Sequence, residues 1–221
     1  MQNQTTVHPL ESAHTLVRLL LHVSMATQGI GVLYYIGLLF CFEGPHRHNT
    51  PDLITLYIEQ DGIFTTLHVM IMIITMIAWS VWLVKLAQRA RHYGQMTESP
   101  FRVVISYIIP IYALWGPYSY MKRLMATHAT PTLVENSSSS LLSGWWSVWV
   151  VFNMSAGMLS RLSDSYLLQD DLLGYAFIRL IDITIWCVVL SLSIQFISQV
   201  TRRQIYFEEH IDSYNVAKHF D

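Results

Sequence analysis

Residues 64–86 read FTTLHVMIMIITMIAWSVWLVKL, an almost unbroken apolar run. An α-helix rises about 1.5 Å per residue, so roughly 20 apolar residues cross the hydrocarbon core of a bilayer. The run has about this length, and it lacks the polar alternation of a helix on the surface of a soluble protein. We therefore predict that residues 64–86 form a transmembrane helix.

Three further runs have the same character, at residues 16–40, 144–163 and 173–198. The whole chain is 52 % hydrophobic and only 13 % charged, which is not the balance of a soluble domain. A membrane helix satisfies its own backbone hydrogen bonds. The sequence therefore predicts an all-α integral membrane helical bundle with four transmembrane helices, in a single membrane domain over residues 1–221.

The charges around residues 64–86 give an orientation. Acidic residues dominate the preceding loop, whereas basic residues follow the helix. The positive-inside rule places the basic end in the cytoplasm and the acidic loop outside. Four spans then leave the N- and C-termini in the cytoplasm of a bacterial inner (cytoplasmic) membrane. The charges used are acidic Glu43, Asp52, Glu59 and Asp61, and basic Lys85, Arg89, Arg91 and Arg102.

Residues 106–124, SYIIPIYALWGPYSYMKRL, begin like a fifth span and then break off. Phe101 to Leu114 would be about 21 Å long as a helix, which is too short for a full crossing. If this stretch returns to the cytoplasm, ten of the 13 Lys and Arg residues lie inside, and only Arg47, Arg161 and Arg179 do not. We therefore predict one short re-entrant or interfacial cytoplasmic helical hairpin at about residues 100–127.

The residues around this hairpin suit its turns. Ser99 and Pro100 can cap and start a helix, Pro110 can kink it, and Gly116 with Pro117 can turn the chain. A polar, Ser-rich linker is expected at about residues 128–143. Five tryptophans gather toward the inner helix ends, as in an aromatic belt: Trp79, Trp82, Trp145, Trp146 and Trp149.

Three stretches carry a family resemblance: ARHYGQMTESPFRVVISYIIPIYALWGPYSYMKRLMATHA, LLSGWWSVWVVFN and ISQVTRRQ. Together they resemble a bacterial multi-pass membrane family known as domain of unknown function 4328, over roughly residues 85–204. One departure is FRVVISY, where members often have GWAVGWW after SP. The resemblance implies no activity or cofactor. The matching positions are Arg89, Ala90, Ser99, Pro100, Pro110, Ile111, Pro117, Tyr118, Gly144, Trp145, Trp146, Arg202 and Arg203.

Ionisable residues inside a predicted span mark a candidate site. Arg179 and Asp182 lie three residues apart on one helix face, where an ion pair can form. Asn153, His68 and Gln28 are expected at comparable depth on other helices. Together they form either an interhelical network that fixes packing or a polar site for a solute or proton.

Sequence motifs of enzymes are missing from the chain. It contains no GxSxG, HExxH or P-loop pattern, so we expect no catalytic residue, cofactor or metal site. His22 and His68 are expected at opposite depths, which disfavours haem ligation by this pair. The net charge of −2 gives no indication of a nucleic-acid partner. An intramembrane enzyme or redox protein is therefore the least supported class.

The remaining candidate is a basic cytoplasmic surface. Each such cation near a membrane contributes about 1 kcal/mol to binding of anionic lipid headgroups, although the same charges could serve only to set topology. We expect a non-enzymatic accessory, assembly or lipid-contacting component; the alternative is a small-solute or ion permease or channel using Arg179 and Asp182. Membrane lipids are the expected partners, together with a larger membrane-protein complex or a homo-oligomer. The surface comprises Lys85, Arg89, Arg91, Arg102, Lys122 and Arg123.

Overall fold

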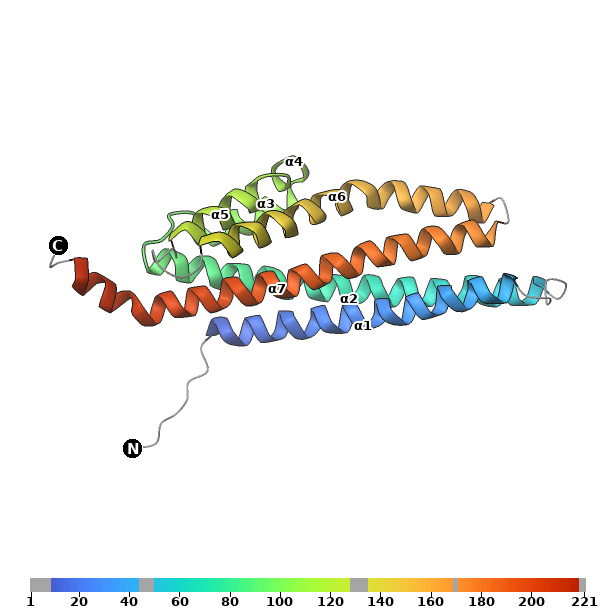
Figure 1. Ribbon diagram of the computed structural model, residues 1–221, viewed down its shortest axis with the longest axis horizontal. Helices are drawn as coiled ribbons and strands as arrows, with labels where there is room; N and C mark the ends of the chain where they lie inside the picture. Colours follow the sequence, from blue (N-terminus) through green and yellow to red (C-terminus); the bar gives the residue numbers. More distant parts are fainter. Residues whose placement is uncertain (1–8, 44–49, 128–134, 169–170, 219–221) are drawn as a thin grey trace, which may run out of the picture. The chain divides into compact units, whose positions relative to one another are not determined.

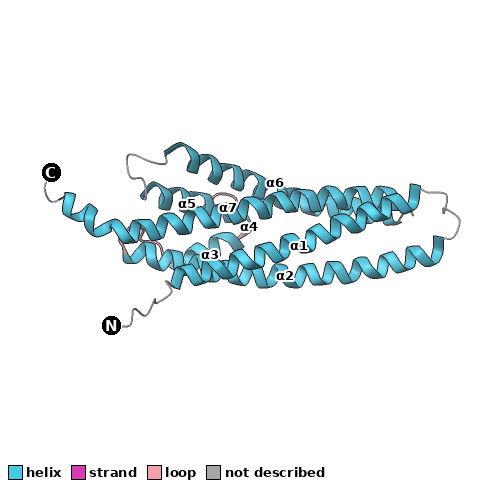
Figure 2. Ribbon diagram, turned by 60° about the horizontal axis from the view of Figure 1, so that its bottom comes forward, coloured by secondary structure: helices cyan, strands magenta, loops and turns pink. Residues whose placement is uncertain are grey.

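The computed structural model describes residues 9–43, 50–127, 135–168 and 171–218, and these residues form helices and turns without a strand (Figures 1 and 2). The all-α prediction is confirmed over this part of the chain. The long helices are α1 (Pro9–Glu43), α2 (Thr50–His92), α6 (Glu135–Leu168) and α7 (Leu172–Lys218). Three short helices lie between α2 and α6: α3 (Pro100–Ile108), α4 (Pro110–Ala113) and α5 (Gly116–Thr127).

Among the described residues, three helices are long and apolar enough to cross a membrane, as in an integral membrane protein. The stretches are Leu10–Phe40 in α1, Asp61–His92 in α2 and Leu173–His210 in α7. The fourth predicted span, residues 144–163, is helical within α6 but is not among them. Its Trp, Ser, Gly and Asn residues lower its hydropathy below that of the other three.

Each long helix extends beyond its apolar run. Helix α6 begins at Glu135, so residues 135–143 of the expected linker are helical, whereas residues 128–134 lie outside the described part. Helix α7 likewise continues past residue 198 to Lys218. An apolar run marks only the part of a helix that suits hydrocarbon, and polar helical turns continue on either side of it.

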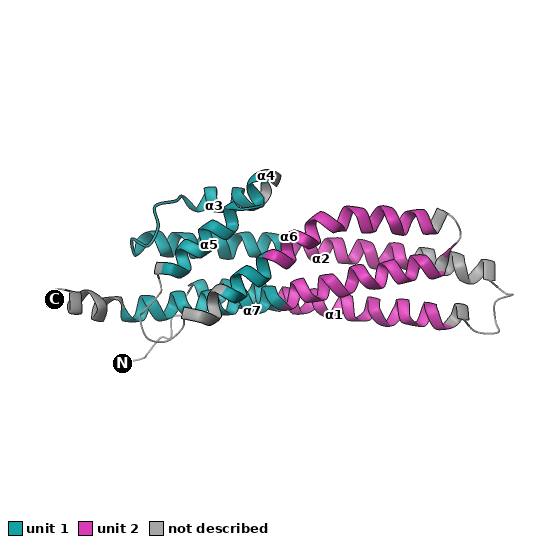
Figure 3. Ribbon diagram, turned by 45° about the horizontal axis from the view of Figure 1, so that its top comes forward, with its two compact units in different colours: residues 1–19, 76–146, 192–221 teal, residues 20–75, 147–191 magenta. Residues whose placement is uncertain are grey.

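The contacts group the chain into two compact units (Figure 3). Unit 1 comprises the described residues within 1–19, 76–146 and 192–221. Unit 2 comprises the described residues within 20–75 and 147–191. Unit 1 therefore holds the end of α2, all of α3–α5 and the start of α6. The segment from the end of α2 to the start of α6 therefore lies within one unit. The single membrane domain over the whole chain stays a prediction.

Helix α2 ends in a glycine turn. Gly94 has a left-handed φ of 68°, which glycine adopts without steric cost. The N–H of Gly94 donates to the carbonyl of Arg91 at 3.1 Å, and the N–H of Gln95 donates to the carbonyl of Ala90 at 2.9 Å. This is the Schellman pattern of helix C-termini. This turn ends α2, and the chain continues through a short loop to α3.

The predicted start and break of the hairpin are present. The Ser99 hydroxyl accepts from the N–H of Arg102 at 3.3 Å, with Pro100 in the first turn of α3. Ile109 is extended, as expected before a proline, so α3 ends there and α4 begins at Pro110. Helix α5 begins at Gly116 and packs against α3.

Tryptophans fill the core of unit 1. Trp82 and Trp145 are 0 % and 1 % exposed, so the aromatic-belt prediction is wrong for these two. Their indole N–H groups donate to hydroxyls of α7, Trp82 to Thr201 at 3.0 Å and Trp145 to Ser193 at 2.9 Å. Trp145 also stacks on Phe196 with ring centroids 4.4 Å apart. The indoles therefore hold α2 and α6 to α7 within this unit.

Unit 2 contains segments of α1, α2, α6 and α7. One group of buried residues joins α1 to α7: Tyr35 and Leu38 from α1, and Ala176 and Ile183 from α7. Gly31 lies opposite Ile183, and a Cβ at this glycine would be 3.2 Å from the Ile183 side chain. Glycine thus permits a close approach of the two helices.

Candidate functional site

A carboxylate with two phenol partners lies in unit 2. The Tyr35 hydroxyl of α1 donates to Oδ1 of Asp61 in α2. The Tyr175 hydroxyl of α7 donates to Oδ2 of the same carboxylate at 2.5 Å. Three helices therefore meet at one carboxylate, and both of its oxygens accept a hydrogen bond.

Arg179 completes this group, which we call the Asp61 cluster: Tyr35, Asp61, Tyr175, Arg179 and Asp182. Arg179 Nε donates to the Tyr35 hydroxyl at 3.1 Å. Its Nη atoms lie 3.9 Å from Asp61 Oδ1 and 3.7 Å from Asp182 Oδ2. The guanidinium also lies 5.8 Å from the centroid of the Tyr35 ring. The ion pair predicted between Arg179 and Asp182 is thus present.

The sequence prediction missed the centre of this cluster. It assigned Asp61 to the outer acidic loop and considered neither Tyr35 nor Tyr175. The spacing of Asp61, Thr65 and His68, four and then three residues, places all three on one face of α2. This spacing could have indicated that the helix predicted from residue 64 already begins by Asp61.

A second polar pair lies in the same unit. Gln28 Nε2 is 2.8 Å from Nδ1 and 3.1 Å from Nε2 of His68. The His68 ring meets the Trp186 ring edge-on with centroids 6.0 Å apart. Trp186 Nε1 is buried and has no partner among the described residues. Gln28 and His68 are therefore brought together as predicted.

Asn153 does not join either group. Its side chain is exposed on α6, and Nδ2 donates to the carbonyl of Trp149 in the preceding turn at 2.7 Å. The five predicted polar residues therefore form two separate pairs and one outward-facing amide.

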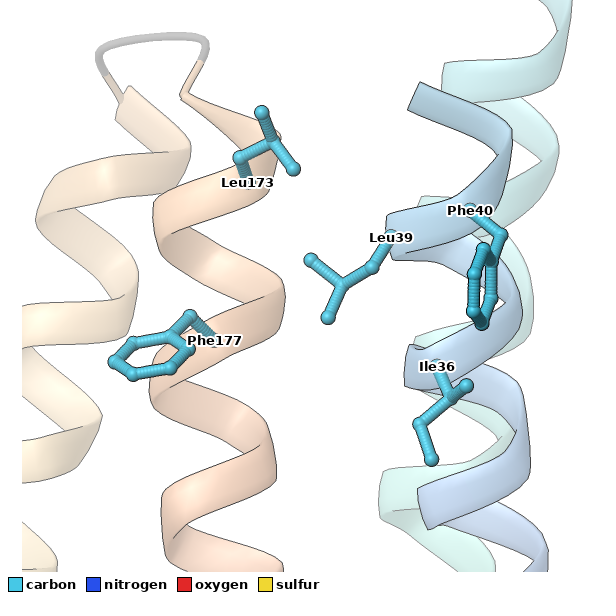
Figure 4. A pocket seen from close by; sticks show the side chains of 5 residues that line it. All are labelled: Ile36, Leu39, Phe40, Leu173 and Phe177. Atoms are coloured by element: carbon cyan, nitrogen blue, oxygen red, sulfur yellow. The ribbon is translucent and has the colours of Figure 1, made fainter. Parts of the chain in front are cut away.

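An apolar groove lies between α1 and α7 in unit 2 (Figure 4). Its volume is about 420 Å³. All of its lining side chains are apolar: Ile36, Leu39, Phe40, Leu173 and Phe177. Such a lining suits hydrocarbon, and none of these five side chains can form a hydrogen bond with a solute.

Some cations of the predicted basic surface form ion pairs within unit 1. Arg89 pairs with the buried Glu208 at 3.4 Å, and Lys85 is half-buried. Arg123 pairs with Glu98 at 2.7 Å but is still 59 % exposed. The exposed cations of this surface are therefore Arg91, Arg102, Lys122 and Arg123.

Two buried phenols lie in α3 and α5. The hydroxyls of Tyr107 and Tyr120 have no hydrogen-bond partner among the described residues. Burial raises the pKa of Tyr107, and the nearby Tyr120 adds to this effect. Burial also raises the pKa of Tyr120, Glu98 raises it further and Arg123 opposes the change. Both phenols are therefore neutral at ordinary pH.

The ligand groups of a metal site do not come together in the described part of the chain. No three of its His, Cys, Asp and Glu side chains are close enough to share an ion.

The residues that carry the family resemblance all lie in unit 1. Ser99 and Pro100 start α3, Pro110 starts α4, and the Tyr118 and Trp146 rings are 6.4 Å apart. No curated protein and no solved structure matches the chain. The family model described as Domain of unknown function (DUF4328) matches residues 49–203. Because this match covers most of the 221 residues, the chain belongs to the DUF4328 family.

Proposed function

We propose that the chain is a four-span protein of a bacterial inner membrane whose α3–α5 hairpin lies in the cytoplasmic membrane interface and contacts lipid. In this proposal α6 is the fourth span and both termini are cytoplasmic. The protein acts as a non-enzymatic accessory or assembly component, holding a lipid-contacting surface at the inner leaflet.

The observation that carries this proposal is the exposed apolar surface of the hairpin. Large apolar side chains exposed together on a short helical segment are typical of a membrane or partner surface. The same short helices, α3–α5, also carry the exposed cations Arg102 and Lys122, and helices that lie in the plane of a membrane combine apolar and basic side chains in this way. The apolar side chains are Phe101, Ile109, Leu114 and Trp115, which are 72, 48, 46 and 51 % exposed.

The unit structure supports the topology. The chain leaves α2, passes through α3–α5 and begins α6 without leaving unit 1. A full crossing by the hairpin would need about 20 residues in one apolar helix. Helix α3 has nine residues and α4 has four, so neither reaches that length.

A spin label at residue 115 tests the proposal. In a variant with Cys41→Ser and Cys187→Ser, Trp115→Cys is labelled and the protein is placed in lipid vesicles. We expect relaxation by oxygen to exceed relaxation by a water-soluble nickel chelate, because the label lies among acyl chains. Thr97→Cys, at an exposed loop position before α3, is the matched control and should show the reverse order. A nickel-dominated signal at position 115 contradicts the interfacial hairpin.

The second candidate function is that of a proton or ion permease. Its support is the Asp61 cluster, where one arginine lies between two carboxylates inside two candidate spans. Both carboxylate oxygens of Asp61 already accept a hydrogen bond from a phenol, which favours a fixed structural network over a transport site. The permease predicts proton or cation flux into proteoliposomes that Asp182→Asn abolishes without lowering the yield of folded protein. Wild-type protein that gives no flux above empty vesicles excludes it.

A further inference from the structure

One half of the outward face of α6 in unit 2 is polar. Asn153, Gly157, Ser160 and Asp164 are all exposed. Their spacing of four, three and four residues places them on one side of the helix. We call these four residues the α6 polar face. The adjoining half of the exposed surface is apolar, with Val151, Met154 and Met158 at 61, 74 and 70 % exposure.

Asn153 lies near the middle of the proposed fourth span, residues 144–163. One amide N–H is used by the Trp149 carbonyl, but no described residue bonds to Oδ1 or to the second N–H. A polar group facing hydrocarbon without a hydrogen bond costs several kcal/mol. This exposed amide therefore needs a partner from outside the described residues.

Other outward-facing polar groups of unit 2 differ from Asn153. The hydroxyls of Thr66 and Thr184 each donate their only hydrogen to a carbonyl of their own helix, Gly62 at 2.8 Å and Leu180 at 2.7 Å. A hydroxyl can satisfy its donor in this way, whereas a carboxamide carries two N–H bonds and a strong acceptor. Of these three groups, only the Asn153 amide leaves a donor open.

We propose that the α6 polar face packs against the same face of a second copy of this chain, in a two-fold symmetric dimer. The proposal rests on the four-span topology proposed above, in which both copies cross the membrane in the same direction. A carboxamide is both donor and acceptor, so the two Asn153 side chains can pair across a two-fold axis.

The rest of the face is self-complementary. Gly157 leaves room for a close helix approach, since a Cβ at this residue would meet nothing within 4 Å. Beside it, Arg161 and Asp164 are exposed, and neither has an ion-pair partner among the described residues. In parallel helices, Arg161 of each copy reaches Asp164 of the other. The face thus offers two equal ion pairs to a second copy.

Cysteine cross-linking in membranes tests the contact. In the Cys41→Ser, Cys187→Ser variant, Ser160→Cys places a thiol on the α6 polar face and Met158→Cys places one on the apolar half at similar depth. We expect an oxidant to link Ser160→Cys into a dimer and to leave Met158→Cys monomeric. Equal dimer yields at both positions, or none at either, overturn the proposal.

Dimer affinity gives a second readout. Asn153→Leu removes the amide and should weaken association in bilayers, measured by energy transfer between labelled copies, by about fivefold to tenfold. Thr184→Val removes an outward-facing hydroxyl from α7 and should leave the affinity unchanged. Arg161→Asp alone should weaken the dimer, and Arg161→Asp with Asp164→Arg should restore it. Variants that all associate like the wild type contradict the proposal.

Failure of the dimer and failure of the topology are distinguishable. A membrane-impermeant maleimide should not label Asn153→Cys, near the middle of the proposed span, in intact vesicles if α6 spans the bilayer. Ready labelling overturns the fourth span and the dimer together. Protection without cross-linking keeps the span, rejects the second copy and assigns the face to a different membrane helix.

Discussion

Asp61 connects three helices through its side chain, and its removal should be costly. Asp61→Ala leaves Arg179 without its bridging carboxylate and two phenols without their acceptor. Removing one partner of a buried pair costs about 3–5 kcal/mol, and the 20 % exposure of the Asp61 side chain places the loss toward the lower end. We expect a marked fall in the melting temperature of the detergent-solubilised protein.

Two further variants control this prediction. Asp182→Asn should lower the melting temperature less, because Asp182 contacts Arg179 at 3.7 Å from a more exposed side chain. Asp61→Asn combined with Arg179→Met removes both charges and should recover part of the loss. If Asp61→Ala melts like the wild type, the cluster contributes nothing to stability.

The sequence identified part of this cluster. An ionisable pair three residues apart inside an apolar helix is visible without a structure, which is why Arg179 and Asp182 were predicted. Tyr35 and Tyr175 were not, because a tyrosine within an apolar run looks like core or lipid-facing surface until its partner is known. Asn153 was grouped with Arg179 and Asp182 only because it is expected at a similar depth in the membrane. Depth does not indicate which way a side chain faces.

The α3–α5 hairpin depends on the close fit at Gly116. A Cβ there would lie 3.0 Å from the Tyr112 ring and 3.1 Å from Ser106 Cβ in α3. Overpacking of this kind costs about 1–3 kcal/mol. We expect Gly116→Ala to lower the melting temperature and to speed proteolysis of the α3–α5 hairpin.

Gly144 provides the matched control. It lies in α6, and a Cβ there would meet nothing within 4 Å. Replacing a glycine inside a helix by alanine contributes about 0.5–1 kcal/mol of stability. Gly144→Ala should therefore raise the melting temperature. If both variants shift the melting temperature in the same direction, the close fit at Gly116 has no energetic effect.

The helix breaks were predictable because they rest on local chemistry. Ser99, Pro100 and Pro110 act through their own backbone and the next turn, so a single sequence contains the information. The helix ends were less predictable. Polar residues such as those at positions 135–143 are compatible with either a helix or a linker, and tertiary contacts decide between them.

Reporter fusions test the topology of the chain. The four-span proposal places a reporter fused after Ser138 in the cytoplasm, one after Asp171 outside and one at the C-terminus in the cytoplasm. If α6 does not cross, the Asp171 fusion moves to the cytoplasm and the C-terminal fusion moves outside. An outside reporter after Ser138 instead contradicts the re-entrant hairpin.

Composition and run length predicted the all-α class and four membrane spans, of which three, among the described residues, are long and apolar enough to cross a membrane. They did not predict the two units, because these depend on which helix faces pack together. Residues 144–163 show the limit of hydropathy. Trp145 lowers the hydropathy of the run although it is fully buried, since its indole N–H is satisfied by Ser193.

The Asp61 cluster also has a consequence for biosynthesis. Tyr35 precedes Asp61 by only 26 residues, so α1 and α2 alone contain the carboxylate and its first donor. Tyr175 follows Asp61 by 114 residues and emerges from the ribosome much later, with Arg179 in the next turn. The α1–α2 pair alone therefore leaves one oxygen of Asp61 without its phenol donor, and α7 supplies that donor only after most of the chain has been synthesised.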